Sequence, residues 1–238
     1  MTRNPTAILS LATTLALLFI PSVASAHKDD YIDETLVFLT LQRGELEPEY
    51  WFDSVRTSDG DHFLRHNLAL EYGVSDHLMV DGRITLGDSS GNGFDAARAE
   101  VRYRFGNEGD RPVDIALSGE VNSERTPEGD RETALEPRLI LSKDFLTGRA
   151  NATLNLSEEI PTTGGGSSFR PAFGLRYDPS ELFRIGAELQ YDRQLRETSV
   201  VPQIAMTLPH DANLRFGYSK AIHHGGADFV RIALELEF

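Results

Sequence analysis

Cysteine is absent from this chain of 238 residues. No disulfide can hold the fold together, and no thiol is available for chemistry. After residue 26 the chain also lacks any long apolar run. This excludes a helical membrane protein, because a spanning helix needs about 20 apolar residues. A transmembrane β-barrel remains possible, since only alternate residues of its strands are apolar.

Basic residues are a minority, with 23 Lys and Arg against 37 Asp and Glu and a formal net charge of −14. This balance argues against a nucleic-acid partner. No serine stands in a nucleophile motif, and Gly164 to Gly166 lacks the strand, helix and lysine of a phosphate loop. We therefore expect no enzyme activity, no catalytic residue, no cofactor and no metal site.

The first 26 residues have the pattern of a secretory signal peptide. Arg3 precedes an almost uncharged apolar run from Ala7 to Ile20, and Ala24-Ser25-Ala26 is a small-x-small cleavage site. We expect cleavage after Ala26 and export of the mature chain.

The end of the chain alternates with a period of two. Apolar side chains occupy every second position from Val230 to Phe238, and Arg231, Ala233, Glu235 and Glu237 stand between them. This is typical of a strand with one oily face and one polar face. Similar segments recur from residue 45 onward, so residues 45–238 are predicted to form an all-β, closed, antiparallel up-and-down barrel. We expect about twelve strands, with ten as the alternative.

Two kinds of connection alternate along the predicted barrel. Five short turns, the first being Gly73–Asp76, are assigned to the periplasm, and the longer Gly-, Ser- and acid-rich loops to the extracellular side. The apolar face is expected to point outward into lipid, because tyrosines such as Tyr72 and Tyr103 lie near strand ends where an aromatic girdle sits. A soluble periplasmic β-protein, with its apolar face inward, is the alternative. Prolines within predicted strands, such as Pro137 and Pro202, suggest bulges at the rim.

Residues 27–44 form a separate predicted region. Leu36 to Leu39 is continuously apolar, and so short a run does not discriminate a periplasmic helix, a plug inside the lumen or an extra strand. This N-terminal periplasmic or plug segment is the least determined part of the chain.

The polar face of the predicted strands is rich in arginine and carboxylate, which suits bidentate pairing in a confined lumen. These pairs could plug the barrel or form a charged constriction that selects solutes. The charged residues expected to line the lumen are Arg83, Arg98, Glu100, Arg102, Arg104, Asp114, Glu120, Glu136, Arg138, Arg176, Arg184, Glu188, Arg215, Arg231 and Glu235.

The final strand, which ends on Phe238, resembles the last strand of Gram-negative outer-membrane β-barrels. The turn Glu71-Tyr72-Gly73-Val74-Ser75-Asp76-His77-Leu78 resembles the Tyr-Gly-hydrophobic-Ser/Thr-Asp turn of small outer-membrane barrels. These include the transporter-like barrels of the MetA pathway of phenol degradation. The resemblance implies an outer-membrane location, lipid contact and insertion by the outer-membrane assembly machinery. It also implies a membrane-assembly signal at Phe238, Leu236 and Leu234.

Together these features predict an outer-membrane barrel that acts as a passive, porin-like channel or transporter for small solutes, possibly apolar or aromatic ones. One alternative is a structural or interaction barrel with a plugged lumen and acidic surface loops. An outer-membrane enzyme is a weaker alternative.

Overall fold

The computed structural model describes residues 31–33, 35–87, 93–126, 129–209, 212–223 and 226–238. The predicted signal peptide and its cleavage site lie outside these residues. Within them, no helix is long and apolar enough to cross a membrane. The described part of the chain contains twelve strands: β1 (Leu46–Arg56), β2 (His62–Ser75), β3 (Leu78–Gly87), β4 (Gly93–Arg104), β5 (Asp114–Arg125), β6 (Arg131–Phe145), β7 (Ala150–Pro161), β8 (Ser168–Ser180), β9 (Phe183–Asp192), β10 (Glu197–Leu208), β11 (Ala212–His223) and β12 (Asp228–Leu236).

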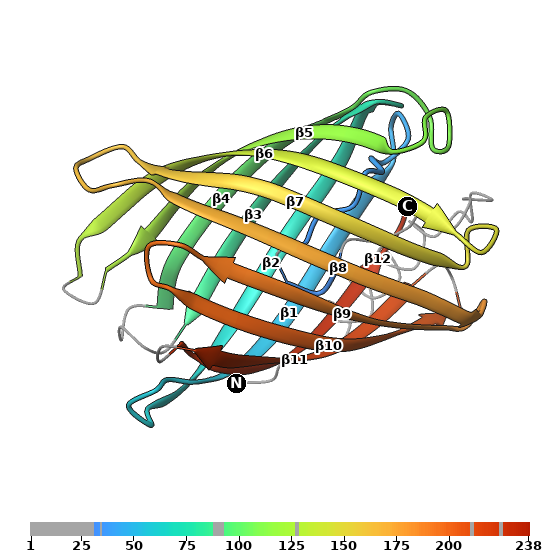
Figure 1. The fold of residues 1–238 in the computed structure, drawn as a ribbon. Coiled ribbons are helices and arrows are strands. Elements are labelled where there is room, and N and C mark those ends of the chain that lie inside the picture. The colour runs from blue at the N-terminus through green and yellow to red at the C-terminus, as the bar shows by residue number, and fades with distance from the viewer. Residues whose placement is uncertain (1–30, 34, 88–92, 127–128, 210–211, 224–225) are drawn as a thin grey trace, which may run out of the picture.

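Every strand pairs antiparallel with its neighbours in the chain, and β12 pairs with β1 to close the barrel (Figure 1). This confirms the predicted closed up-and-down barrel, with twelve strands rather than ten among the described residues. The seam runs from Glu49 opposite Glu235 to Arg56 opposite Asp228. Two backbone hydrogen bonds between Leu46 and Phe238, of 3.1 and 3.0 Å, extend it.

The apolar residues of the strands point away from the lumen, as the alternation predicts. Leu70, Val101 and Leu175 are each about half exposed, whereas the residues between them are largely buried. Because adjacent side chains of a strand point to opposite faces, one alternating pattern sets both surfaces. The outer face also carries Tyr103, whose ring meets the Phe105 ring edge-on at 5.1 Å.

The expected bulges are absent at Pro137 and at Pro202 themselves. The pairing of β6 with β7 keeps one register on both sides of Pro137, and the pairing of β10 with β11 keeps one register across Pro202. Each proline lacks an N–H, so pairing stops locally with one neighbour. The other neighbour stays aligned, since Pro137 faces Gly119 and Pro202 faces Ala187. Register shifts do occur in β10 between Thr198 and Ser199, just before Pro202, and in β8 between Tyr177 and Ser180, a stretch that includes Pro179. Another lies between Gly73 and Ser75.

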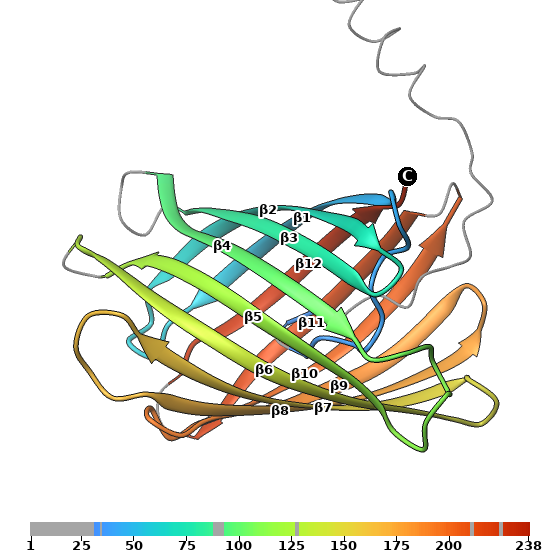
Figure 2. The same cartoon turned by 90° about the horizontal axis from the view of Figure 1, so that it is seen from above.

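One end of the barrel carries the connections that follow β1, β3, β5, β7, β9 and β11, and the other carries the remaining connections and the C-terminus (Figure 2). We call these the loop end and the turn end. The expected difference in length is incomplete, because the longest connection between strands, residues 105–113, lies at the turn end. Residues 31–33 and 35–44, which we call the inner segment, form neither helix nor strand. They lie inside the barrel (blue in Figures 1 and 2), and residue 44 leaves it at the turn end, where its N–H bonds to the Gly73 carbonyl at 2.8 Å.

Candidate functional site

A belt of carboxylates crosses the lumen wall on the first six strands. Strand register places one acid of each strand opposite the next, and all six side chains are buried. Acids directly opposite one another destabilise a sheet unless cations neutralise them. The members of this belt, in order around the wall, are Glu47, Glu71, Asp81, Glu100, Glu120 and Glu136.

Arginines flank the belt on both sides. Toward the turn end, Arg102 Nε donates to Glu100 at 3.0 Å, and Arg138 pairs with Glu136. Toward the loop end, Arg83 and Arg98 stand directly opposite each other. They contact their belt carboxylates, Asp81 and Glu120, only at 3.7 and 3.8 Å. The pairs on the turn side are thus tighter than those on the loop side.

Glu188 of β9 holds the inner segment through its backbone. The buried carboxylate accepts hydrogen bonds from the N–H groups of Asp33 and Thr35, at 3.0 and 2.9 Å, and from Gln203 Nε2 at 3.1 Å. Strand β7 contributes Asn155, whose side-chain amide bonds both the N–H and the carbonyl of Leu36. The barrel wall therefore satisfies backbone groups that would otherwise be buried without partners.

Arg231 of β12 makes the main ionic contact with the inner segment. Its guanidinium bonds both oxygens of Asp53, at 2.7 and 2.9 Å, and also the Ile32 carbonyl at 2.9 Å. Arg231 Nη1 also lies 3.3 Å from the Asp33 carboxylate, although the two residues are 198 positions apart in the chain. Toward the turn end, Arg215 sits between the buried Glu49 and Glu235.

Glycines on the lumen face make room for the inner segment. A Cβ on Gly174 would lie 2.5 Å from the Tyr31 ring, and one on Gly217 would lie 2.7 Å from the Ile32 side chain. Tyr31 donates to the Asn151 side chain at 3.2 Å, and burial raises the pKa of its hydroxyl, which stays protonated as a donor. Leu36 and Phe38 pack on Ala116 and Ile140 in a small apolar cluster.

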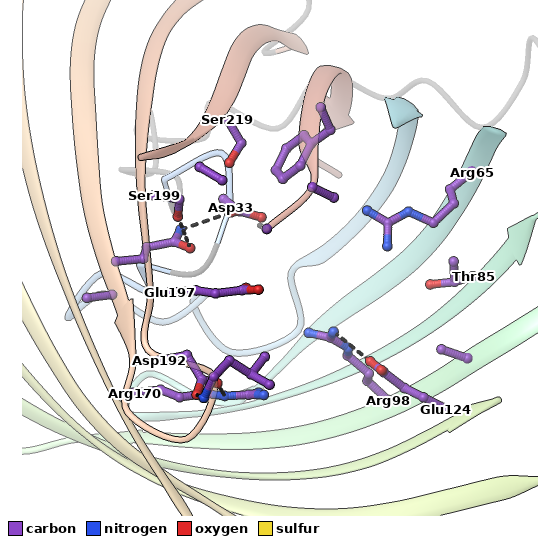
Figure 3. Close-up of a pocket in the computed structure, with 18 of the residues that line it drawn as sticks. Asp33, Arg65, Thr85, Arg98, Glu124, Arg170, Asp192, Glu197, Ser199 and Ser219 are labelled. Carbon is purple, nitrogen blue, oxygen red and sulfur yellow. Dashed lines mark hydrogen bonds and ion pairs between the residues drawn. The ribbon is translucent and has the colours of Figure 1, made fainter. Parts of the chain in front are cut away.

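On the loop-end side of Asp33, the lumen opens into a cavity of about 700 Å³, which we call the vestibule (Figure 3). It reaches the loop end, where Thr126, Leu195 and Ala227 border it. Toward the turn end, a second cavity beside Tyr31 measures about 20 Å³, room for about one water molecule. The inner segment thus separates a wide, open half of the lumen from a filled half.

Each wall of the vestibule carries charges of both signs. In Figure 3, Arg65 and Arg98 lie on one wall with Glu124, while Asp33, Glu197 and the pair of Arg170 with Asp192 lie toward the other. The arginines that line the vestibule are Arg65, Arg83, Arg98, Arg125, Arg138, Arg170 and Arg231, and the acids are Asp33, Asp95, Glu124, Glu136, Asp192 and Glu197. The two signs nearly balance, so the vestibule is polar without a strong net charge.

The charged residues expected in the lumen divide into groups by their contacts. Arg83, Arg98, Glu136, Arg138 and Arg231 line the vestibule. Glu100, Glu120, Glu188, Arg102, Arg215 and Glu235 are buried in the belt or beside the inner segment. The last group lies nearer the turn end: Arg104 bonds the Asp76 carbonyl, Asp114 accepts from the Gly109 N–H, Arg176 pairs with Asp178, and Arg184 bonds Asn213.

Several lumen residues were missed by the sequence analysis. Arg65 continues the alternation that contains Asn67, but lies beyond the segment in which alternation was recognised. Trp51 and Asp53 share the face of Glu49 in β1, and the period of two could have found them. Asp33 lies in irregular chain, where periodicity carries no signal.

No protein-family model matches this sequence, and no curated protein matches it. Solved structures do share its fold. The KdgM porin superposes with a TM-score of 0.63 at 9% identity, covering 81% of this chain and 99% of the porin. The NanC porin has a TM-score of 0.62 at 13% identity, covering 79% of this chain and 98% of that chain.

An outer membrane channel from Pseudomonas putida F1 superposes with a TM-score of 0.61 at 12% identity. The match covers 89% of this chain and all of the channel. At such low identity these likenesses establish the fold, which is that of outer-membrane β-barrels, and leave the activity to be argued from the lumen.

Proposed function

We propose that this protein is an outer-membrane channel for small polar solutes, and that the inner segment controls passage. The observation that carries the proposal is the vestibule, a cavity of about 700 Å³ inside a closed barrel, bordered by loops at one end and by the inner segment at the other. Charged side chains from both walls face it, as in a selective constriction. The KdgM and NanC structures, porins by name, share the barrel fold.

The proposed location follows from the outer surface. A closed barrel with an apolar exterior and a charged interior satisfies its backbone hydrogen bonds within the wall, which a lipid environment requires. The exposed side chains of Leu68, Leu117, Leu175 and Ile185 suit acyl chains. The partners of this surface are therefore outer-membrane lipids.

Conductance in a planar bilayer tests the channel. We expect the folded full-length protein to show low or intermittent conductance, because the inner segment fills the turn-side half of the lumen. A variant without residues 31–43 should conduct steadily. A barrel that stays closed after this deletion, while heat-modifiable gel mobility shows it to be folded, would contradict the proposal.

A second candidate function is a structural or interaction barrel with a permanently filled lumen. One observation favours it: Glu188, Arg231 and Arg215 bind the inner segment with several short contacts from buried positions. Conductance separates the two candidates, because a structural barrel would not conduct as the full-length chain under any voltage.

We also propose that Phe238, with Leu236 and Leu234, is a signal for the assembly machinery. Phe238 bonds Leu46 through its backbone, so it also closes the seam. Phe238→Ala keeps those backbone bonds and removes the ring. If the ring is the signal, this variant should insert slowly in cells yet fold normally into detergent or lipid in vitro. Normal insertion in cells would overturn this role.

The finer assignment, to the transporter-like barrels of the MetA pathway of phenol degradation, rests on the turn from Glu71 to Leu78. The structure places this turn between β2 and β3, where Asp76 accepts a hydrogen bond from the N–H of Arg43 at 3.2 Å. The turn thus anchors the inner segment as it leaves the lumen. Flux measurements with phenol and with a polar solute of similar size would test whether this chain shares the specificity of that group.

A further inference from the structure

We propose that the arginine wall of the vestibule is a binding subsite for solutes that carry a single carboxylate together with hydroxyl or amino groups. The wall is formed by Arg65, Arg83 and Arg98 on the adjacent strands β2, β3 and β4. This inference rests on the proposed channel function and names its solute class.

The first argument is that two of these cations face each other. Arg83 stands directly opposite Arg98 in the β3–β4 ladder. Like charges in this position repel. Arg98 is partly neutralised by Glu124 at 3.1 Å, but Arg83 reaches its carboxylate, Asp81, only at 3.7 Å. An anion between the two guanidinium groups would relieve the repulsion.

The second argument is that donors in this wall are left unused. Among the described residues, no acceptor lies within hydrogen-bond distance of Arg65 Nε, Arg83 Nε or Trp51 Nε1. Trp51 is almost fully buried and stands opposite Asn67 on β2, two residues from Arg65, which stands opposite Asp53 and pairs with it at 3.5 Å. These three atoms are buried, and Arg125 Nε is in the same condition, so a solute would accept from them only if the Arg65 and Arg83 side chains turned toward the vestibule.

Arg102 differs from the arginines of this wall in its burial and its contacts. Arg102 is almost fully buried, donates to Glu100 at 3.0 Å and contacts two carbonyls of the inner segment. The Arg65 side chain is 32% exposed and the Arg98 side chain 22% exposed, both toward the vestibule. A solute entering from the loop end can therefore reach these guanidinium groups, which present the fork geometry that suits a carboxylate.

The opposite wall of the vestibule determines which chemical groups the solute carries besides its carboxylate. It offers Gln190, Ser199, Asp192 and Glu197, which accept hydrogen bonds from hydroxyl or amino groups. Of the two acids there, Asp192 is paired with Arg170 at 2.6 Å, so Glu197 is the acid that would repel a second carboxylate. A volume of about 700 Å³ lies within the range of small-molecule sites, about 300–1,000 Å³. The chemistry thus favours polar monocarboxylates over dianions and over neutral polyols.

Trp51 supplies a direct probe, because it is the single tryptophan of the chain. Its ring lies under the Arg83 guanidinium at 3.9 Å and near that of Arg231 at 5.0 Å. An anion that draws Arg83 toward itself changes the field at the indole. Tryptophan emission of the folded protein in detergent should therefore report binding without any need for conductance.

The experiment titrates the full-length protein with gluconate, with sorbitol, which lacks the carboxylate, and with glucarate, which has two. Gluconate should give a saturable emission change, glucarate a weaker one, and sorbitol none. Arg65→Gln should weaken gluconate binding at least tenfold while leaving Arg83 over Trp51. Arg83→Gln should do the same, with binding measured by calorimetry because its emission baseline differs.

Arg56→Gln is the matched control. Arg56 lies at the loop end of β1, is exposed and does not line the vestibule, so this variant makes the same charge change and should bind normally. Equal responses to gluconate and sorbitol, or unchanged affinity in both wall variants, would overturn the subsite. A protein that binds gluconate but never conducts would refute the channel and leave the subsite standing.

Discussion

The two halves of the lumen contain the same types of charged residue, but these residues find different partners for their hydrogen bonds and ion pairs. In the turn-side half, arginines and carboxylates bond the inner segment as well as each other, and Arg102, Arg215 and Glu188 are almost fully buried. In the vestibule, Arg65 and Arg98 are partly exposed and contact the buried Asp53 and Glu120 at 3.5 and 3.8 Å, and Arg98 also pairs with the exposed Glu124 at 3.1 Å. Buried networks in which polar groups pair with one another rigidify a structure, and charged groups that stay exposed in a cavity are open to a ligand or to water.

This difference indicates that the two halves of the lumen have different roles. The turn-side half holds a piece of the chain, and the vestibule is the half available to solutes. Arg231 links them, because it bonds Asp53, contacts the inner segment and also lines the vestibule. A solute that changes the position of Arg231 would therefore act on the contact that retains the inner segment.

The largest expected effect comes from filling the space that the inner segment occupies. Gly174→Val places side-chain atoms where the Tyr31 ring lies, and Gly217→Val does so at Ile32. The double variant should expel this part of the segment and raise bilayer conductance to the level of the variant without residues 31–43. The control is Gly82→Val, because a Cβ there meets no atom within 4 Å. Unchanged conductance in the double variant would mean that the segment does not close the lumen.

A smaller effect is expected from Glu188→Ala, which leaves the N–H groups of Asp33 and Thr35 without their carboxylate acceptor. An unsatisfied buried donor costs about 1–3 kcal/mol. The fraction of time spent open in single-channel records should therefore rise about tenfold or more, since about 1.4 kcal/mol corresponds to a factor of ten. Glu132→Ala, at an exposed position of β6, is the control and should behave as the unaltered protein.

The smallest expected effect comes from comparing two threonines, one in each half of the lumen, whose surroundings differ in access to water. Thr153 lies in the filled half, is fully buried, and bonds Asn151 at 2.8 Å and Ser142 at 3.0 Å. Thr153→Val should lower the free energy of unfolding by about 1–3 kcal/mol, because its partners stay buried. Urea unfolding from lipid vesicles measures the change.

Thr85 is the counterpart in the vestibule, where its hydroxyl donates to Asn67 at 2.7 Å. Thr85→Val should cost about 1 kcal/mol or less, since cavity water can replace the lost donor. If the two valine variants were equally destabilised, the two halves would not differ in hydration as the structure indicates.

Much of the barrel could be predicted from the sequence because its signal is local. Alternation along β12 separates Arg231 and Glu235 from Ile232 and Leu234 without reference to any other strand. The same alternation, extended by two residues along β2 from Asn67 to Arg65, would have placed Arg65 in the lumen. The effect of the strand prolines was misjudged. A proline lacks one N–H, and strand register decides which of the two neighbouring strands loses that hydrogen bond.

What the sequence by itself determined is therefore the closed barrel, its outward apolar face and the set of charges that point inward. A period of two encodes these features within each strand. What only the tertiary structure decided is how those charges meet. Closure and register line up the carboxylate belt across six strands, and they bring Asp33 to Arg231 over 198 positions of sequence. The boundary between filled lumen and vestibule follows from such long-range contacts, for which an irregular inner segment carries no local pattern.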